Sequence, residues 1–312
     1  ELNDLPAGKA LASQCATGTN TLQTPGVVTV PCQAPGTYFG GTGGASANIL
    51  DQIRPFRGYR SISMLTPQFN SNYHSLQALF QHTFSASQVN VAYTWAKNLT
   101  DNQTDRSTAP MDSYRIRLDR GRATLDRRHI FTANYIYDVP WFNKRHDFVG
   151  NVLGGWELSG IVSFQTGLPF TGLGSNFDPA GLGNTPAITA GNRPETLCDP
   201  NSGGAQTFLQ WFNTTCLQLN PTNGVAPFGN VVSNTGRGTV NGPPTKRFDF
   251  SVFKNIRIGE GSKKIQLRGE AFNIFNKTNF RAISATVTAA AYGQVTSVRD
   301  PRTIQLGAKF IF

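Results

Sequence analysis

The most constraining feature of this sequence is a series of long segments in which apolar and polar residues alternate. The last of them, Arg302–Phe312, alternates without interruption. Its apolar set is Ile304, Leu306, Ala308, Phe310 and Phe312, and its other set is Thr303, Gln305, Gly307 and Lys309. Because successive side chains of a strand point to opposite faces, the segment predicts a strand with one apolar and one polar face.

Seven further segments carry the same signal with different strength. It is regular in Ser87–Asn98, Gly154–Gly167, Lys246–Ile258 and Lys263–Ala271, looser in Tyr73–Phe84 and Arg127–Val139, and weakened in Ile53–Leu65 by Pro55 and Gly58. Within Lys246–Ile258, Phe253 and Lys254 stand on the sides opposite to those that the alternation requires. The sequence therefore predicts an all-β protein of about eight antiparallel strands, most near the 9–11 residues that cross a bilayer at a tilt.

Alternation alone fits a soluble β-sandwich as well as a membrane barrel. Strand length favours the barrel, since strands of globular proteins cluster near 5–6 residues. Aromatic residues near the predicted strand ends favour it too, because they resemble interfacial girdles. These residues are Trp95, Tyr135, Tyr137, Trp141, Phe142, Trp156, Phe310 and Phe312.

The connections between the predicted strands are of two kinds, short turns and long loops. Phe84–Gln88 and Gly259–Ser262 are tight turns, whereas Leu99–Asp126, Thr166–Thr245 and Asn276–Pro301 are long and rich in Gly, Asn and Pro. Outer-membrane barrels have short periplasmic turns and long external loops, so we expect the three long loops outside. Val139–Leu153 is long for a periplasmic turn, and the same count places residues 1–52 on the periplasmic side, where a long segment fits less well.

Composition and charge narrow the function classes. Of the 312 residues only 15% are charged, and no apolar run approaches the ~20 residues of a membrane-spanning helix. The formal net charge of +10 is scattered in short groups such as Arg127-Arg128, which argues against a nucleic-acid partner. The four cysteines fall into two local pairs, Cys15 with Cys32 and Cys198 with Cys216, without zinc-ligand spacing. We expect two loop-stapling disulfides formed in an oxidising compartment.

The chain end resembles the signal by which the insertion machinery recognises bacterial outer-membrane barrels, a polar residue, a glycine and two aromatic residues at fixed spacing. Gln305, Gly307, Phe310 and Phe312 carry that resemblance. Longer stretches, among them "VAYTWAKNLTDN", "DRRHIFTANYIYDVP", "GGWELSGIVSFQTGLPF" and "LRGEAFNIFNKTNF", resemble the C-terminal barrel of TonB-dependent-receptor-like proteins. The subgroup that they resemble most is Oar-like and carries a carboxypeptidase-regulatory-like domain near its N-terminus.

The resemblance covers residues 53–312 and divides the chain into a loop-rich segment 1–52 and a barrel segment 53–312. Such receptors have an N-terminal plug, a TonB-contacting box and a barrel of 22 strands. The chain shows about eight strands and neither plug nor box, so the resemblance implies the C-terminal portion of a larger barrel in the bacterial outer membrane. It also implies as partners the outer-membrane lipid, the insertion machinery, the plug and a TonB-type energy transducer.

Motifs for catalysis, metal or cofactor binding are weak. His74, His82, His129 and His146 lack ligand spacing, Asp101–Asp105 lacks the glycine and glutamate of a calcium loop, and Gly172–Asn184 lacks the strand and helix that frame a nucleotide site. The separate charges Glu157, Glu270, Asp249, Arg247 and Arg268 are expected to form a hydrogen-bonding network inside the barrel against a plug. We therefore expect no enzyme, no metal and no cofactor.

The expected function is a receptor or transporter barrel that binds a substrate at its external loops and admits it past a plug outside this sequence. Aromatic residues of the loop Thr166–Thr245 are the weak candidates for substrate binding, and self-packing of the loop is the simpler account of them. They are Phe177, Trp211, Phe212 and Phe228. The alternatives are a surface adhesion or assembly protein anchored by the barrel, and a soluble β-sandwich binding module.

Overall fold

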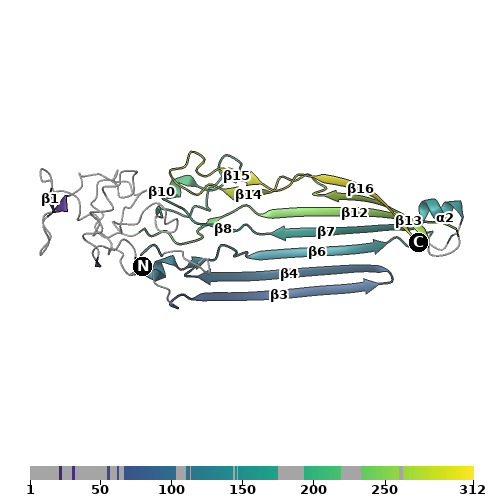
Figure 1. Ribbon diagram of the computed structural model, residues 1–312, viewed down its shortest axis with the longest axis horizontal. Coiled ribbons are helices and arrows are strands. Elements are labelled where there is room, and N and C mark those ends of the chain that lie inside the picture. The colour runs from purple at the N-terminus through teal and green to yellow at the C-terminus, as the bar shows by residue number, and fades with distance from the viewer. Residues whose placement is uncertain are drawn as a thin grey trace.

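The computed structural model of the protein describes residues 21–22, 30–31, 55–56, 62, 67–102, 110–112, 114–142, 145, 147–174, 193–218, 233–259 and 263–312. Its main element is one antiparallel sheet with the strand order β16-β13-β12-β7-β6-β4-β3, in which the short β5 also pairs with β4 (Figure 1). The long strands are β3 (Ser71–Phe84), β4 (Ser87–Thr100), β6 (His129–Asp138), β7 (Trp156–Gln165), β12 (Thr245–Arg257), β13 (Lys264–Phe272) and β16 (Thr303–Ile311).

The remaining elements are short. Four two-stranded ribbons pair β1 (Thr21–Leu22) with β2 (Val30–Pro31), β8 (Pro169–Phe170) with β11 (Val240–Asn241), β9 (Glu195–Thr196) with β10 (Leu217–Gln218), and β14 (Phe280–Ile283) with β15 (Val295–Val298). The others are β5 (Gly121–Arg122), the 3-10 helices η2 (Ile116–Asp119) and η3 (Thr214–Cys216), and α2 (Phe148–Leu153). No helix of the described part of the chain is long and apolar enough to cross a membrane.

The all-β, antiparallel fold is confirmed, and seven of the eight predicted strands are present with ends shifted by one or two residues. The eighth candidate, Ile53–Leu65, lies mostly outside the described residues. Its described residues, Pro55, Phe56 and Ile62, are not in a strand. The boundary between segments 1–52 and 53–312 also falls outside the described residues.

The pairing register shows that the alternation of each strand joins that of its neighbours. Val91, Ala133, Val162 and Phe248 stand opposite one another across four strands. Ala92, Thr132, Ser163 and Arg247 form the next row and point to the other side. Across these four strands the sheet therefore has an apolar face and a polar face, as the sequence predicts.

Phe253 and Lys254, which break the alternation of β12, have partners that explain their positions. Lys254 lies on the apolar face but is only 7% exposed, because its Nζ donates hydrogen bonds to the carbonyl oxygens of Val152 (3.0 Å) and Gly154 at the end of α2. Its ammonium group also lies 5.1 Å from the ring centroid of Trp156. On the polar face, the Cζ atom of Arg268 lies 5.6 Å from the ring centroid of Phe253.

The two ends of the sheet differ as the loop lengths predict. The β3–β4 turn, α2 and the C-terminus lie at one end, and β8, β10, β14 and β15 lie at the other (Figure 1). The connection between β6 and β7 is long because it contains α2, whose N-terminus is capped by Asp147: its Oδ1 accepts a hydrogen bond from the Gly150 amide at 2.9 Å. Hydrogen bonds from Arg145 and from the Gly150 amide lower the pKa of Asp147.

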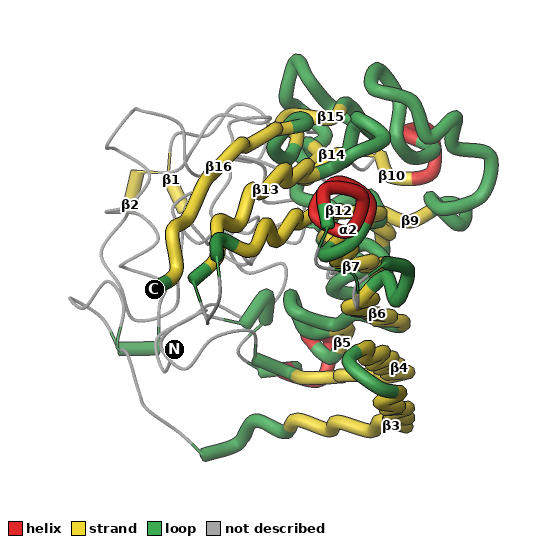
Figure 2. Tube along the Cα trace, turned by 90° about the vertical axis from the view of Figure 1, so that its right-hand side faces the viewer, coloured by secondary structure: helices red, strands yellow, loops and turns green. Residues whose placement is uncertain are grey.

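The sheet is an open arc and not a closed barrel. Seen along the strands it is a curved series with β3 and β16 at its two ends (Figure 2). No described strand pairs with the outer side of either edge. Unpaired backbone groups are costly in lipid, so both free edges must be paired or covered for the arc to be stable in a membrane.

The register generates a prediction about the two faces. Val162→Arg places a charge on the apolar face, between Ala133 and Phe248, and is expected to lower the free energy of unfolding in lipid by about 2–4 kcal/mol. Ser159→Arg, on the polar face opposite Ser251, is expected to have little effect. Urea titration of the full-length protein in vesicles, followed by the heat-modifiable gel band, measures both. Equal losses in the two variants would contradict the assignment of faces.

Candidate functional site: the loop assembly beyond the strand ends

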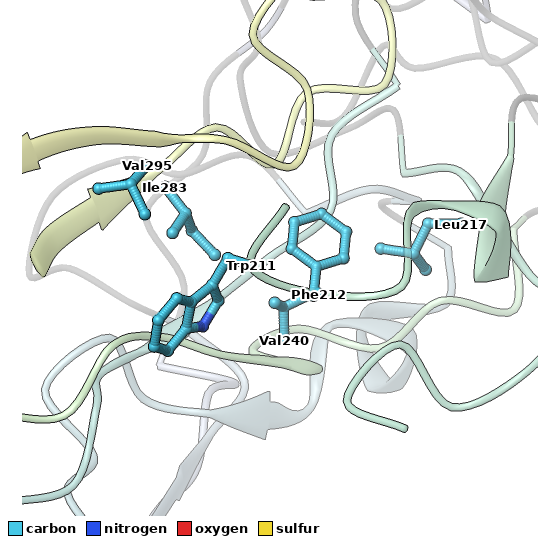
Figure 3. Packing of buried hydrophobic residues seen from close by; sticks show 6 residues of the cluster. All are labelled: Trp211, Phe212, Leu217, Val240, Ile283 and Val295. Atoms are coloured by element: carbon cyan, nitrogen blue, oxygen red, sulfur yellow. The ribbon is translucent and has the colours of Figure 1, made fainter. Parts of the chain in front are cut away.

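The loops between the long strands form a folded unit with its own core beyond the strand ends. Trp211, Phe212, Leu217 and Val240 from the loop between β7 and β12 pack with Ile283 and Val295 of β14 and β15 (Figure 3). Leu217 and Val240 have no exposed surface. Loop polypeptides usually lie on the surface without such a core, so this assembly is a fixed scaffold that can hold side chains in set positions.

Two polar side chains of the loop core make hydrogen bonds inside it. Trp211 Nε1 donates a hydrogen bond to the Asn241 carbonyl at 2.8 Å, and the Tyr292 hydroxyl donates to the Leu217 carbonyl at 2.9 Å. Burial raises the pKa of Tyr292 to about 12, so the hydroxyl remains a donor throughout the neutral range.

A disulfide closes one end of the assembly. Cys198 and Cys216, which form the second of the two predicted pairs, are bonded with their Cα atoms 4.7 Å apart. The bond links Cys198, which lies two residues after β9, to Cys216, which directly precedes the core residue Leu217 of β10. The other predicted pair, Cys15 with Cys32, lies outside the described residues.

A buried ionic cluster joins two loops that are far apart in the sequence. Asp119 Oδ1 accepts hydrogen bonds from Arg193 Nη1 (2.7 Å) and Arg237 Nε (2.9 Å), and Asp119 Oδ2 accepts one from the Met111 amide (2.7 Å). Burial lowers the pKa of Arg193, although the facing carboxylate of Asp119 opposes the shift. No sequence signal identifies this cluster, because its members are separated by 74 and 118 positions.

Of the four aromatic residues of the long loop that are weak candidates for substrate binding, the structure describes two. Trp211 and Phe212 are 8% and 2% exposed and pack inside the loop core, where their rings meet Phe280 and Tyr292 edge to face. Both side chains therefore pack against other parts of the protein. Phe177 and Phe228 lie outside the described residues.

Two pockets open beside the loop assembly. The mouth pocket, of about 410 Å³, lies at the loop end of β12, β13 and β16 and includes Arg247, Arg281 and Arg299 with Asp300. Arg247 belongs to the polar face of the sheet, so this pocket opens toward that face. Nearby, Arg127 Nη1 donates to the Thr166 carbonyl at 2.7 Å, and burial together with the charge of Arg299 lowers the pKa of Arg127.

The second pocket, which we call the rim pocket, has a volume of about 720 Å³ and lies at the loop end of β4, β6 and β7. The described residues of its walls include four basic side chains and no carboxylate. The lining residues are Lys97, Leu99, Gly121, Arg122, Arg128, Thr166, Gly167, Asn201, Arg237, Gly238, Thr239, Asn241 and Pro244.

The inward charges predicted from the sequence lie on the polar face. Arg247 Nε donates to Asp249 at 2.8 Å, and Arg268 Nε donates to Gln266 at 2.7 Å, which in turn donates to Asn255 at 3.0 Å. Glu157 and Glu270 occupy the same face by register. Such a surface offers hydrogen-bond donors and acceptors to whatever fills the interior of the completed barrel.

The histidines do not come together. His74 and His82 lie on the apolar side of β3, and His129 Nδ1 lies 2.8 Å from the Tyr93 hydroxyl; His146 is outside the described residues. Within the described part of the chain no three His, Cys, Asp or Glu side chains gather closely enough to hold a metal ion. Asp101, at the start of the segment that lacks the residues of a calcium loop, pairs with Arg120 at 3.1 Å.

The residues of the predicted assembly signal lie in or directly after β16. Gln305 and Gly307 stand opposite Glu270 and Arg268, and Phe310 stands opposite Ile265. Phe310 and Phe312 stack with their ring centroids 6.1 Å apart, and Phe312 is 90% exposed. All are accessible at the free edge of the sheet.

Asp119→Asn tests the buried ionic cluster. The change leaves the Arg193 and Arg237 charges buried without a counter-charge, which is expected to cost the loop assembly roughly 3–5 kcal/mol. The expected readout is a rate of external protease cleavage on outer membranes at least about 100-fold higher, since cleavage follows the population of opened loops. Asp300→Asn, at an exposed carboxylate, is the matched control. Unchanged cleavage of Asp119→Asn would contradict the role of the cluster.

The disulfide is tested by peptide mapping. The unreduced full-length protein is unfolded, its free thiols are blocked, and it is digested with chymotrypsin, which cuts between the two cysteines at Phe208, Trp211 and Phe212. The digest should contain one linked peptide pair with Cys198 and Cys216, and reduction should separate the pair. Because the bond closes a loop of 18 residues, the double change to serine is expected to destabilise the loop assembly by about 3 kcal/mol. Labelling of either thiol in the unreduced protein would show that the bond is absent.

A family model described as an outer membrane beta barrel domain matches residues 13–305. No curated protein and no solved structure matches the chain. The matched range contains six of the seven long strands in full, together with the loop assembly. Given this match and the alternating faces of its long-stranded sheet, the chain belongs to the outer membrane beta barrel domain family, whose place is the bacterial outer membrane.

Proposed function

We propose that the chain is part of the barrel of a TonB-dependent-receptor-like protein of the Oar-like kind, which binds a substrate at its external loops and mediates uptake past a plug. The observation that carries the proposal is the open sheet, whose polar face is lined with charged and amide side chains. A larger barrel with a plug would close both free edges and cover that face.

The loop assembly supports a binding role. Its apolar core, disulfide and buried ionic cluster fix the positions of loops that would otherwise be costly to order on ligand binding. The mouth pocket opens on the polar face, at the level where a substrate would enter a barrel. A binding protein of this kind needs no catalytic residues, so we propose that the protein is not an enzyme.

A surface adhesion or assembly protein anchored by the barrel is the second proposal. The rigid loop assembly serves adhesion as well as it serves uptake. A TonB box upstream of this segment would favour uptake, whereas its absence together with added cell- or sugar-binding domains would favour adhesion. The third possibility drawn from the sequence, a soluble β-sandwich, requires two packed sheets and is disfavoured by membership of an outer-membrane family.

The size of the native protein tests the proposal. An antibody to residues 166–245 is used on unheated and boiled outer membranes. We expect a heat-modifiable band far larger than the 33.9 kDa of this chain, because further strands and a plug must complete the barrel. A band near 33.9 kDa that still shifts on boiling would indicate a small self-closed barrel, which is incompatible with a plugged receptor.

A further inference from the structure

We propose that the rim pocket binds the phosphate-bearing headgroup of a lipid in the outer leaflet of the membrane. The proposal rests on the outer-membrane location of the chain and not on the receptor function. It therefore holds or fails independently of whether the protein takes up a substrate.

The rim pocket lies on the same side of the sheet as the apolar face. Trp95, Lys97 and Leu99 follow one another at intervals of two residues in β4, so they share that side. Trp95 stands in the row with Leu76 and His129, and Thr166, a pocket residue, donates its amide to the His129 carbonyl at 3.0 Å. The pocket therefore begins one step beyond the last aromatic row of the apolar face.

The height of the pocket fits the headgroup layer. A residue adds about 3.3 Å along a strand, so Lys97 lies roughly 6–7 Å beyond Trp95 toward the loops. Trp95 is 48% exposed and belongs to the kind of aromatic residue found at the boundary between acyl chains and headgroups. A cation placed one step further outward meets lipid phosphates rather than acyl chains.

The charges around the rim pocket are unbalanced. Arg122 pairs with Asp126 at 2.8 Å, while Asp119 is shared between Arg237 and Arg193. Lys97 and Arg128 form no ion pair with any residue that the structure describes. Among the described residues, Lys97 and Arg128 thus bring positive charge to the pocket without a paired carboxylate, while Asp119 and Asp126 are buried and do not line it. An anionic ligand would balance the excess charge.

The walls of the rim pocket are fixed before any ligand arrives. A Cβ atom added at Gly121 would lie 2.5 Å from the Arg237 carbonyl oxygen. Gly238 has a positive φ of 65°, and a Cβ there would lie 2.9 Å from the Cβ of Arg122. These close backbone contacts hold Arg122 and Arg237 side by side, as a preorganised anion site requires.

Two features select a lipid phosphate among anions. Guanidinium groups present paired N–H donors that match phosphate oxygens, and Arg128 supplies such a group beside the ammonium of Lys97. Arg122 is already hydrogen-bonded to Asp126 and Asn241, so it contributes positive charge to the wall of the pocket. The pocket volume of about 720 Å³ is large enough for a sugar-phosphate headgroup. The adjoining apolar face, with Leu76 60% exposed, offers a surface on which the acyl chains of the same lipid can lie.

The test compares lipid retention by two doubly substituted forms of the full-length protein. Each is extracted from outer membranes into a zwitterionic detergent, and phosphorylated lipid bound to the intact protein is counted by native mass spectrometry. Lys97→Gln/Arg128→Gln removes the two unpaired cations of the rim pocket and is expected to weaken retention at least about tenfold, since charge-assisted hydrogen bonds to phosphate are lost. Lys263→Gln/Lys264→Gln removes the same charge at the turn end and should retain lipid as the unchanged protein does.

The outcomes decide the proposal. Lys97→Arg/Arg128→Lys keeps both charges and should retain lipid, which separates loss of charge from loss of folding; heat modifiability of every form verifies the barrel. Selective loss in the rim-pocket variant supports the lipid site. Equal losses in both neutralised variants, or no retained phosphorylated lipid in the unchanged protein, would overturn it. Displacement of the lipid by inorganic phosphate alone would also overturn it, because the site would then serve a soluble anion.

Discussion

The hydrogen bonding of the backbone is the constraint on which the rest of this structure depends. A strand that crosses lipid has no water to satisfy its amides and carbonyls, so each must be paired with a neighbouring strand. The main sheet meets this requirement across its width through registers that run along nearly the full length of each strand. At β3 and β16 the requirement is unmet within the described residues, so each of these two edges needs a partner that the described residues do not supply.

Once the registers are fixed, the two faces acquire separate tasks. The apolar face carries exposed aromatic residues near both ends of the strands, and the polar face carries charged and amide side chains that hydrogen-bond to one another. Lys254 shows how strictly the division holds: its charge faces the apolar side only because two carbonyl oxygens of the α2 end and the Trp156 ring surround it. The amphipathic stem of lysine allows this arrangement near a strand end.

The loop assembly follows a different physical rule. Its stability comes from a compact apolar cluster, a disulfide and a buried carboxylate shared by two arginines, all of which work in water. The rim pocket lies at the boundary between the sheet and the loop assembly, next to the aromatic row of the apolar face. Unbalanced basic charge at that boundary faces the part of a membrane where lipid phosphates are found.

The sequence by itself determined the strands, their two faces and the end of the sheet at which the loops gather, because period-two alternation and loop length are local properties. It also indicated the Cys198–Cys216 pair, since the two residues are close along the chain. Only the tertiary structure decided that Trp211 and Phe212 are core residues, that Asp119 joins Arg193 to Arg237, and that Lys97 and Arg128 line one pocket. Those contacts join residues from separate loops, and no local pattern records which distant residue a side chain will meet when the strands pair.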